Sequence, residues 1–142
     1  MRTIRIAAAL ILRPDGKALL VRKRGTVKFM HPGGKIEAGE TPLAALLREL
    51  EEELALRLPP EIPLHLGHYE AEAANEPGHR VEAELFGLYI AHPVGAHAEI
   101  EEIAWVDPAD PGPLNLAPLS RQYILKQSLR LAQASGAARQ DT

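Results

Sequence analysis

Apolar and polar residues follow two different periods along this chain, which divides it into predicted strands and helices. Residues 6–12 form an apolar run without a charge, and such a run is typical of a strand buried on both faces. The turn residues Pro14, Asp15 and Gly16 follow, so residues 18–22 are expected to return as the second strand of a hairpin. Strand patterns recur in three later segments, at 65–73, 80–91 and 98–107.

Two segments have the period of an amphipathic helix. Thr41 is a good N-cap and Pro42 suits the first helical position, so a helix is expected over residues 42–55. At roughly 100° per residue its leucines form one apolar stripe, made of Leu43, Leu46, Leu47, Leu50 and Leu54. A second helix is expected over 119–133, with packing residues Tyr123, Ile124, Leu125, Leu129 and Leu131.

The first helix also carries a ridge of carboxylates. Glu52 and Glu53 lie about 60° and 40° to either side of Glu49, whereas Glu51 points roughly 160° away. Like charges at these spacings repel one another, so a positive group is expected beside the ridge. The alternative interpretation is a solvated face, because glutamate is a good helix former.

The residues before the helix favour a functional ridge. From Gly34 the charged positions follow at fixed intervals, with Glu40, then Arg48 and Glu49, then Glu52 and Glu53. This segment, 34–56, resembles the Nudix box, the signature of hydrolases that cleave nucleoside diphosphates linked to a further group. Ala55 stands where the family usually has glycine, so either this residue is left-handed and mildly strained or the helix continues toward Arg57.

The resemblance implies a fold of the α/β class, the Nudix-type α/β/α sandwich with a mixed β-sheet between helices. It implies that Arg48 pairs with Glu40 and, with Gly34, supports the site. It also implies that Gly33 offers its carbonyl oxygen to a metal ion.

The carboxylates indicate which metal and which catalytic residues to expect. Their oxygens favour hard divalent cations, so Glu49, Glu52 and Glu53 are the expected ligands of Mg²⁺, with Mn²⁺ as an alternative. Glu49 and Glu52 are also expected to act in catalysis. The resemblance implies a further acid from segment 98–107, where Glu99, Glu101 and Glu102 are eligible and Glu101 and Glu102 are favoured; simple solvation is the alternative.

Other polar and aromatic residues are open to two interpretations. Lys23, Arg24 and Lys28 precede the glycine loop and Lys35 follows it, so they either solubilise loops or contact a substrate phosphate, for which Arg24, Lys28 and Lys35 are the candidates. Trp105 is expected to be a core residue rather than a base-stacking one. His65 and His68 are an odd number of positions apart on a predicted strand, so their side chains are expected to diverge rather than share a metal.

Composition and charge exclude several classes of protein and of binding partner. The chain has 142 residues, a net charge of −3 and no cysteine, which excludes disulfides and a cysteine nucleophile and agrees with a cytoplasmic location. No basic stripe is present, so a nucleic-acid polymer is not an expected partner, and the short apolar run near the N-terminus is read as a strand rather than a signal or membrane segment. We expect one domain over 1–134, a flexible tail over 135–142, and apolar strands that could support a homodimer.

These observations together predict a metal-dependent pyrophosphohydrolase acting on a small nucleotide or another diphosphate through attack of water on phosphorus. A nucleoside triphosphate, including an oxidised purine form, is the favoured substrate. The alternative is a catalytically silent Nudix-fold module that binds a nucleotide or a protein. The related isomerase of isopentenyl diphosphate relies on a cysteine, which this chain lacks.

Overall fold

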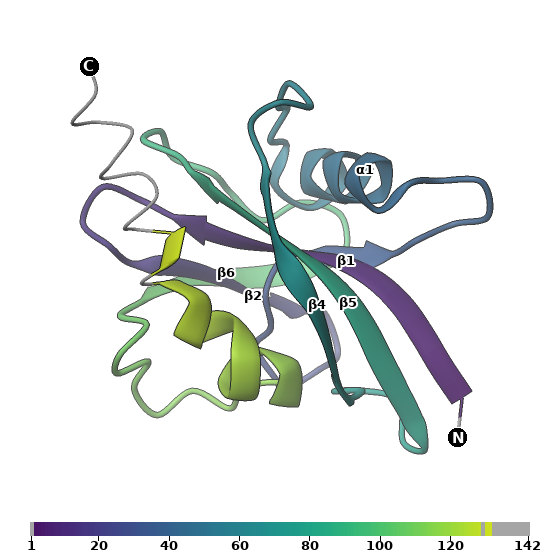
Figure 1. Ribbon diagram of the computed structural model, residues 1–142. Coiled ribbons are helices and arrows are strands. Elements are labelled where there is room, and N and C mark those ends of the chain that lie inside the picture. Colours follow the sequence, from purple (N-terminus) through teal and green to yellow (C-terminus); the bar gives the residue numbers. More distant parts are fainter. Residues whose placement is uncertain (1, 129, 132–142) are drawn as a thin grey trace.

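A mixed sheet lies between helical segments in the computed structural model, which describes residues 2–128, 130 and 131 (Figure 1). Helix α1 (Pro42–Leu54) covers one face of the sheet, and two short helical turns, η1 (Ser120–Ile124) and η2 (Leu125–Gln127), lie against the other. The predicted α/β/α sandwich is therefore confirmed. The strands are β1 (Arg2–Leu12), β2 (Ala18–Lys23), β3 (Gly33–Lys35), β4 (Leu64–Glu72), β5 (His79–Tyr89) and β6 (Ile100–Val106).

Strand β1 is the centre of the sheet, whose strand order is β4-β5-β1-β2-β6. It pairs in parallel with β5 along its whole length, and β3 joins its other side ahead of the hairpin to β2. Ala7, Ala9 and Ile11 face α1, whereas Ala8 and Leu10 face the C-terminal turns. The prediction that this run is buried on both faces is confirmed.

Helix α1 begins and ends as its sequence predicts. The Thr41 hydroxyl accepts a hydrogen bond from the Ala44 amide at 3.1 Å, and Pro42 opens the helix. Ala55 adopts the left-handed conformation, with φ of 53°, and its amide donates to the Glu51 carbonyl at 3.0 Å. Of the two alternatives for Ala55, the strained cap is thus the one that the chain adopts.

We expect Ala55→Gly to stabilise the fold by about 1 kcal/mol, because glycine carries no Cβ to oppose a left-handed backbone. Urea unfolding at neutral pH measures the change. Ala44→Gly, on the exposed first turn of α1, is the control and should lose about 0.5–1 kcal/mol, since its backbone is helical. Equal destabilisation by both glycines would contradict the assigned strain.

Three features differ from the sequence-based predictions. Strand β3 was expected to be a loop, but Gly33–Lys35 pairs with residues 6–8 of β1. A bulge interrupts β4 between His65 and Gly67, with consequences for the histidines described below. The predicted final helix is, where described, a wide π-type turn followed by a 3-10 turn, with Ile124, Leu125 and Leu131 buried but Tyr123 partly exposed.

Several predictions fall outside the described residues. These are the packing of Leu129, the end of the last helix at 132–133 and the tail at 135–142, so the domain limit at 134 stays a prediction. Within the described chain, no helix combines the length and the apolar character needed to cross a membrane.

Candidate active site

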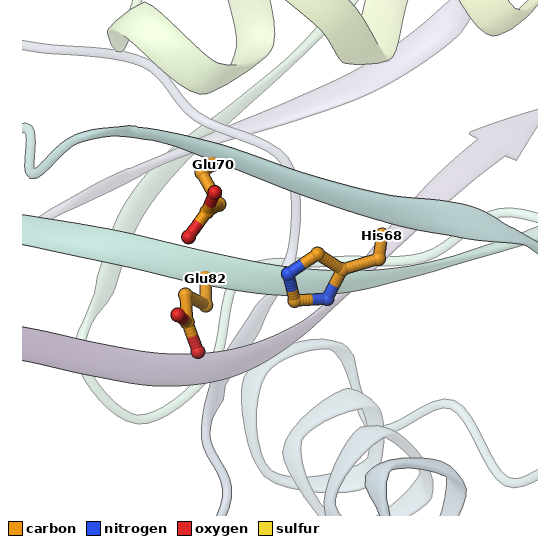
Figure 2. A group of neighbouring side chains, drawn as sticks. All are labelled: His68, Glu70 and Glu82. Atoms are coloured by element: carbon orange, nitrogen blue, oxygen red, sulfur yellow. The ribbon is translucent and has the colours of Figure 1, made fainter.

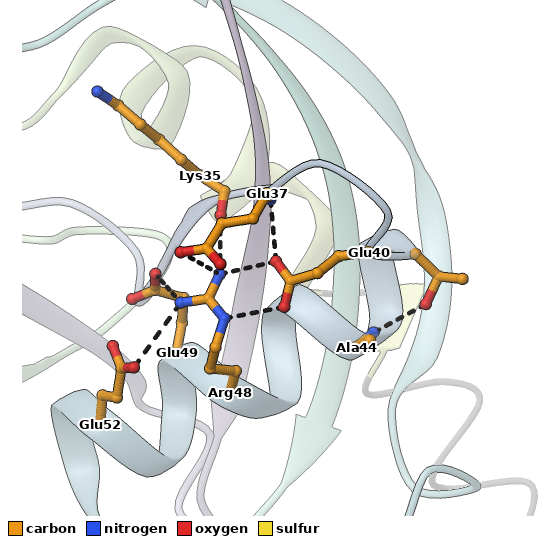
Figure 3. Close-up of polar contacts among 8 residues, drawn as sticks. Lys35, Glu37, Glu40, Ala44, Arg48, Glu49 and Glu52 are labelled. Atoms are coloured by element: carbon orange, nitrogen blue, oxygen red, sulfur yellow. Dashed lines mark hydrogen bonds and ion pairs between the residues drawn. The ribbon is translucent and has the colours of Figure 1, made fainter.

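Arg48 is the centre of a charged network that joins the loop after β3 to α1 (Figure 3). Its guanidinium binds the Glu40 carboxylate through two nitrogens, at 2.9 and 2.8 Å, which confirms the expected pair. It also donates to Glu49 at 2.8 Å and to the Lys35 carbonyl at 3.0 Å. The pairing holds the pKa of Glu40 at about 2. Arg48 is therefore the positive group expected beside the ridge.

Glu53 is the most buried acid of the ridge, with only 5% of its surface exposed. Its carboxylate accepts a hydrogen bond from the Gly33 amide at 3.1 Å, so the helix and β3 meet at this side chain. Burial raises the pKa of Glu53 to about 8, and the nearby negative charge of Glu49 acts in the same direction. Without a cation, this carboxyl group carries a proton at neutral pH.

The Glu49 carboxylate lies directly against Gly34. A Cβ on Gly34 would overlap the Glu49 carboxylate. Burial raises the pKa of Glu49, although its hydrogen bond from Arg48 opposes the shift. The glycine thus leaves room for a partly desolvated carboxylate between β3 and α1.

Glu52 and Glu51 occupy different surroundings, as the helical spacing predicts. Glu52 lies 3.8 Å from Arg48, and 55% of its side chain is exposed, so it borders the network. Glu51 forms an ion pair with Arg57 at 3.0 Å instead. The three acids of the ridge therefore share one side of α1, and Glu51 does not join them.

The acids of segment 98–107 divide between the site and the sheet. Glu101 pairs with Arg24 at 3.0 Å, and Glu102 pairs with Arg22 at 2.8 Å across β2 and β6. Glu99 is instead near enough to Glu53 for its charge to raise the Glu53 pKa. The loop that carries it is tied to α1 by the His97 amide, which donates to the Glu53 carbonyl at 2.8 Å. Of the three eligible acids, Glu99 is thus the one beside the ridge.

The candidate phosphate-binding side chains differ in exposure and in their ion-pair partners. Arg24 is 70% exposed and paired with Glu101, and Lys35 lies 3.7 Å from Glu76 at the tip of the β4–β5 hairpin. Lys28 is half-buried and forms no ion pair with a described residue. Lys23, which was not among the candidates chosen from the sequence, lowers the pKa values of both Glu49 and Glu53 through its charge.

A recess of about 130 Å³ opens beside Gly33 and Gly34. Strands β1 and β5 contribute apolar lining residues, and its polar lining comes from strand ends, loops and η1; the lining includes Ile4, Ile6, Val81, Lys23, His31 and Asn75. The sequence alone did not predict this recess because its lining comes from six separate segments. Trp105 is not part of it; this half-buried ring packs against the core on the α1 side, with the Arg13 guanidinium 4.7 Å from its centre.

His31 lies beneath the recess as a buried neutral ring. Its Nδ1 lies 2.7 Å from the Ser120 hydroxyl, which also accepts from the His31 amide at 3.1 Å. Burial lowers the pKa of His31 to about 3. Nε2 has no hydrogen-bond partner among the described residues.

The donor set of the ridge suits a hard divalent cation. Glu49 and Glu53 are oxygen donors whose burial penalises their charges, and a cation would offset that cost. Glu52 adds an exposed oxygen donor beside them, and Gly33 brings its backbone to Glu53. The residues present therefore fit Mg²⁺ or Mn²⁺.

The buried Glu53 gives a pH dependence that can be measured without activity. In metal-free protein the folded state keeps a proton on Glu53 between about pH 4.5 and 8, where the unfolded state has lost it, so stability falls as the pH rises through this window. Glu53→Gln mimics the protonated form and should remove this loss. We expect the stability of the variant relative to wild type to increase between pH 5 and 8 by on the order of a few kcal/mol.

Urea unfolding of both proteins in a metal chelator tests this prediction. His31 titrates in the opposite sense below pH 6.5, but it is common to both proteins and cancels in the comparison. A difference in stability that does not change between pH 5 and 8 would show that Glu53 is not held protonated.

The chain matches one protein-family model and is similar to several known proteins. The family model of the NUDIX domain matches residues 1–127. Octanoyltransferase of Myxococcus xanthus is 35% identical over 113 residues, covering 75% of this chain and 31% of that protein. 8-oxo-dGTP diphosphatase of Escherichia coli is 34% identical over 74 residues, covering 49% and 54%. CTP pyrophosphohydrolase of Escherichia coli is 32% identical over 129 residues, covering 83% and 86%.

The chain therefore spans about a third of the first relative and about half of the second. Among solved structures, a MutT/nudix family protein from Enterococcus faecalis superposes with a TM-score of 0.76 at 18% identity, over 94% of this chain and 63% of that one. This likeness concerns the fold.

Proposed function

Because this chain belongs to the Nudix domain family, we propose that it is a metal-dependent pyrophosphohydrolase that cleaves a nucleoside diphosphate linked to a further group. The observation that carries the proposal is the pair of carboxylates on α1, half-buried Glu49 and buried Glu53, packed against Gly34 and Gly33. The diphosphatase and pyrophosphohydrolase names of two relatives support a nucleotide substrate.

Each residue of the site has a proposed role. Glu49, Glu52 and Glu53, with the Gly33 carbonyl, would hold Mg²⁺ or Mn²⁺. When bound, the ion would offset the substrate's charge and lower the pKa of water. Arg48 and Glu40 fix the ridge to the loop, so they are positioning residues.

The proton of the attacking water needs an acceptor. Glu52 is exposed at the border of the ridge, and Glu99 is near enough to Glu53 for its charge to affect that carboxyl group, so either carboxylate could take the proton. Glu101 and Glu102 are less suitable than the sequence suggested, because arginines occupy both carboxylates.

The recess beside the ridge is the proposed place for the nucleoside. Its apolar lining suits the flat face of a base, and Lys23 both lines the recess and acts through its charge on Glu49 and Glu53, so it is available to a polyphosphate chain that joins the two. Lys23 is thus a stronger candidate for contact with phosphate than Arg24, Lys28 or Lys35. A nucleoside triphosphate, including an oxidised purine form, remains the favoured substrate.

A nucleotide panel tests the proposed function. The panel should contain CTP, 8-oxo-dGTP, the common nucleoside triphosphates and nucleotide sugars, with Mg²⁺ or Mn²⁺, and both products should be identified. We expect cleavage within the phosphate chain that a chelator abolishes. Tight nucleotide binding without any turnover would identify the chain as a silent binding module instead.

A further inference from the structure

A second group of potential metal ligands lies away from the ridge, on strands β4 and β5. His68 and Glu70 project from β4 and Glu82 from β5, and one ligand atom of each lies within 4.8 Å of the others. Figure 2 shows the two carboxylates side by side, with the edge of the imidazole ring turned toward them. None of the residues of α1 or its preceding loop belongs to this group.

The position of His68 depends on the bulge in β4. A regular strand would direct His65 and His68 to opposite faces, as the sequence predicted, but the register shifts between His65 and Gly67. Both rings consequently reach the same carboxylate, Glu84, at 2.6 Å for His65 and 2.9 Å for His68. The prediction that these side chains diverge is therefore wrong.

The contact with Glu84 also determines which nitrogen of His68 is available. His68 uses Nδ1 in this contact, and an ionised carboxylate can only accept, so Nδ1 must carry the hydrogen. The neutral ring then has its lone pair on Nε2. A carboxylate behind the far nitrogen is the usual outer partner of a metal-binding histidine, since it fixes the tautomer and the ring orientation.

Glu70 and Glu82 form an uncompensated pair. They stand directly opposite each other in the antiparallel pairing of β4 with β5, where like charges repel. Neither forms a hydrogen bond or an ion pair with a described residue, and Glu84 already engages both histidines. Two carboxylates and an imidazole ring thus converge, and no described cationic side chain pairs with either carboxylate.

We propose that His68, Glu70 and Glu82 bind a divalent transition-metal ion, with Zn²⁺ the best match, and that Glu84 orients His68 from behind. Imidazole suits Zn²⁺ and its neighbours, whereas Mg²⁺ prefers oxygen ligands alone. Three protein ligands leave a position open for water, as in many zinc sites. The ion would link the edge strand β4 to β5.

The test is a titration of the full chain, without a histidine tag, with Zn²⁺ in the presence of excess Mg²⁺. The ¹⁵N resonances of the imidazole rings are followed by NMR. We expect the Nε2 resonance of His68 to shift up to one equivalent of Zn²⁺. Glu70→Gln, Glu82→Gln and Glu84→Gln should each weaken this binding at least tenfold, because two remove a ligand and one removes its partner.

Two controls separate this site from others. His92→Gln removes an exposed ring whose hydrogen bond within the described part of the chain is to a backbone carbonyl, and Glu53→Gln alters the ridge, so both should leave the His68 titration unchanged. The proposal is overturned if Zn²⁺ does not shift the Nε2 resonance of His68. It is also overturned if Glu70→Gln, Glu82→Gln and Glu84→Gln all bind Zn²⁺ as tightly as wild type does. It is equally overturned if Glu53→Gln abolishes the shift.

Discussion

Glu53→Gln is expected to lower kcat for nucleotide hydrolysis at least about a hundredfold, even though it should stabilise the metal-free fold at pH 8. Glutamine keeps the size of the side chain and can still accept from the Gly33 amide, so the hydrogen bond at 3.1 Å need not break. What it loses is a negative charge beside the metal. Loss of activity together with a gain in stability is the expected pattern of a residue kept for function.

Glu52→Gln should cause a loss of the same order, because Glu52 lies on the same side of the helix. Glu51→Gln is the matched control and should change kcat little, since Glu51 pairs with Arg57 away from the ridge. Steady-state kinetics with the best nucleotide of the panel measures all three. Similar losses at the three positions would contradict the assignment of helix faces.

Arg48→Lys is expected to lower kcat by about tenfold to a hundredfold with little change in net charge. A lysine ammonium cannot reproduce the two parallel bonds to Glu40 while also reaching Glu49. Glu49 would then lose the partner that opposes its burial, and the loop would lose its attachment to α1. Because Arg48 acts through Glu49, raising the Mg²⁺ concentration should restore part of the activity.

Arg57→Lys is the control for this substitution. Arg57 is 84% exposed and, among the described residues, pairs only with Glu51, so its replacement should leave kcat and the Mg²⁺ dependence unchanged. Wild-type activity of Arg48→Lys at low Mg²⁺ would show that the bidentate geometry does not matter.

The parts of the fold that the sequence predicted are those set by local chemistry. Thr41 and Pro42 start α1, and the charge-free run of β1 requires burial on both faces. The pair of Arg48 with Glu40 came from the resemblance to the box, since seven residues of loop and helix separate them. These features depend on near neighbours or on a motif with fixed spacing.

The features that the sequence missed depend on tertiary contacts. Gly33–Lys35 has no strand periodicity. It forms β3 because its backbone pairs with residues 6–8 of β1. Gly67, with φ of 137°, permits the bulge that brings His65 and His68 together, and a single sequence does not distinguish it from other glycines. The proximity of Glu99 to Glu53 likewise depends on how the loop at 93–99 docks on α1.

The central claim is that Glu49 and Glu53 are retained at an energetic cost in order to bind a divalent cation against a pyrophosphate. Anomalous diffraction from a crystal grown with Mn²⁺ and a non-hydrolysable nucleotide tests it most directly. The account predicts a Mn²⁺ peak within coordinating distance of Glu49, Glu53 and a substrate phosphate. A fully ordered nucleotide with no Mn²⁺ at these carboxylates would contradict it.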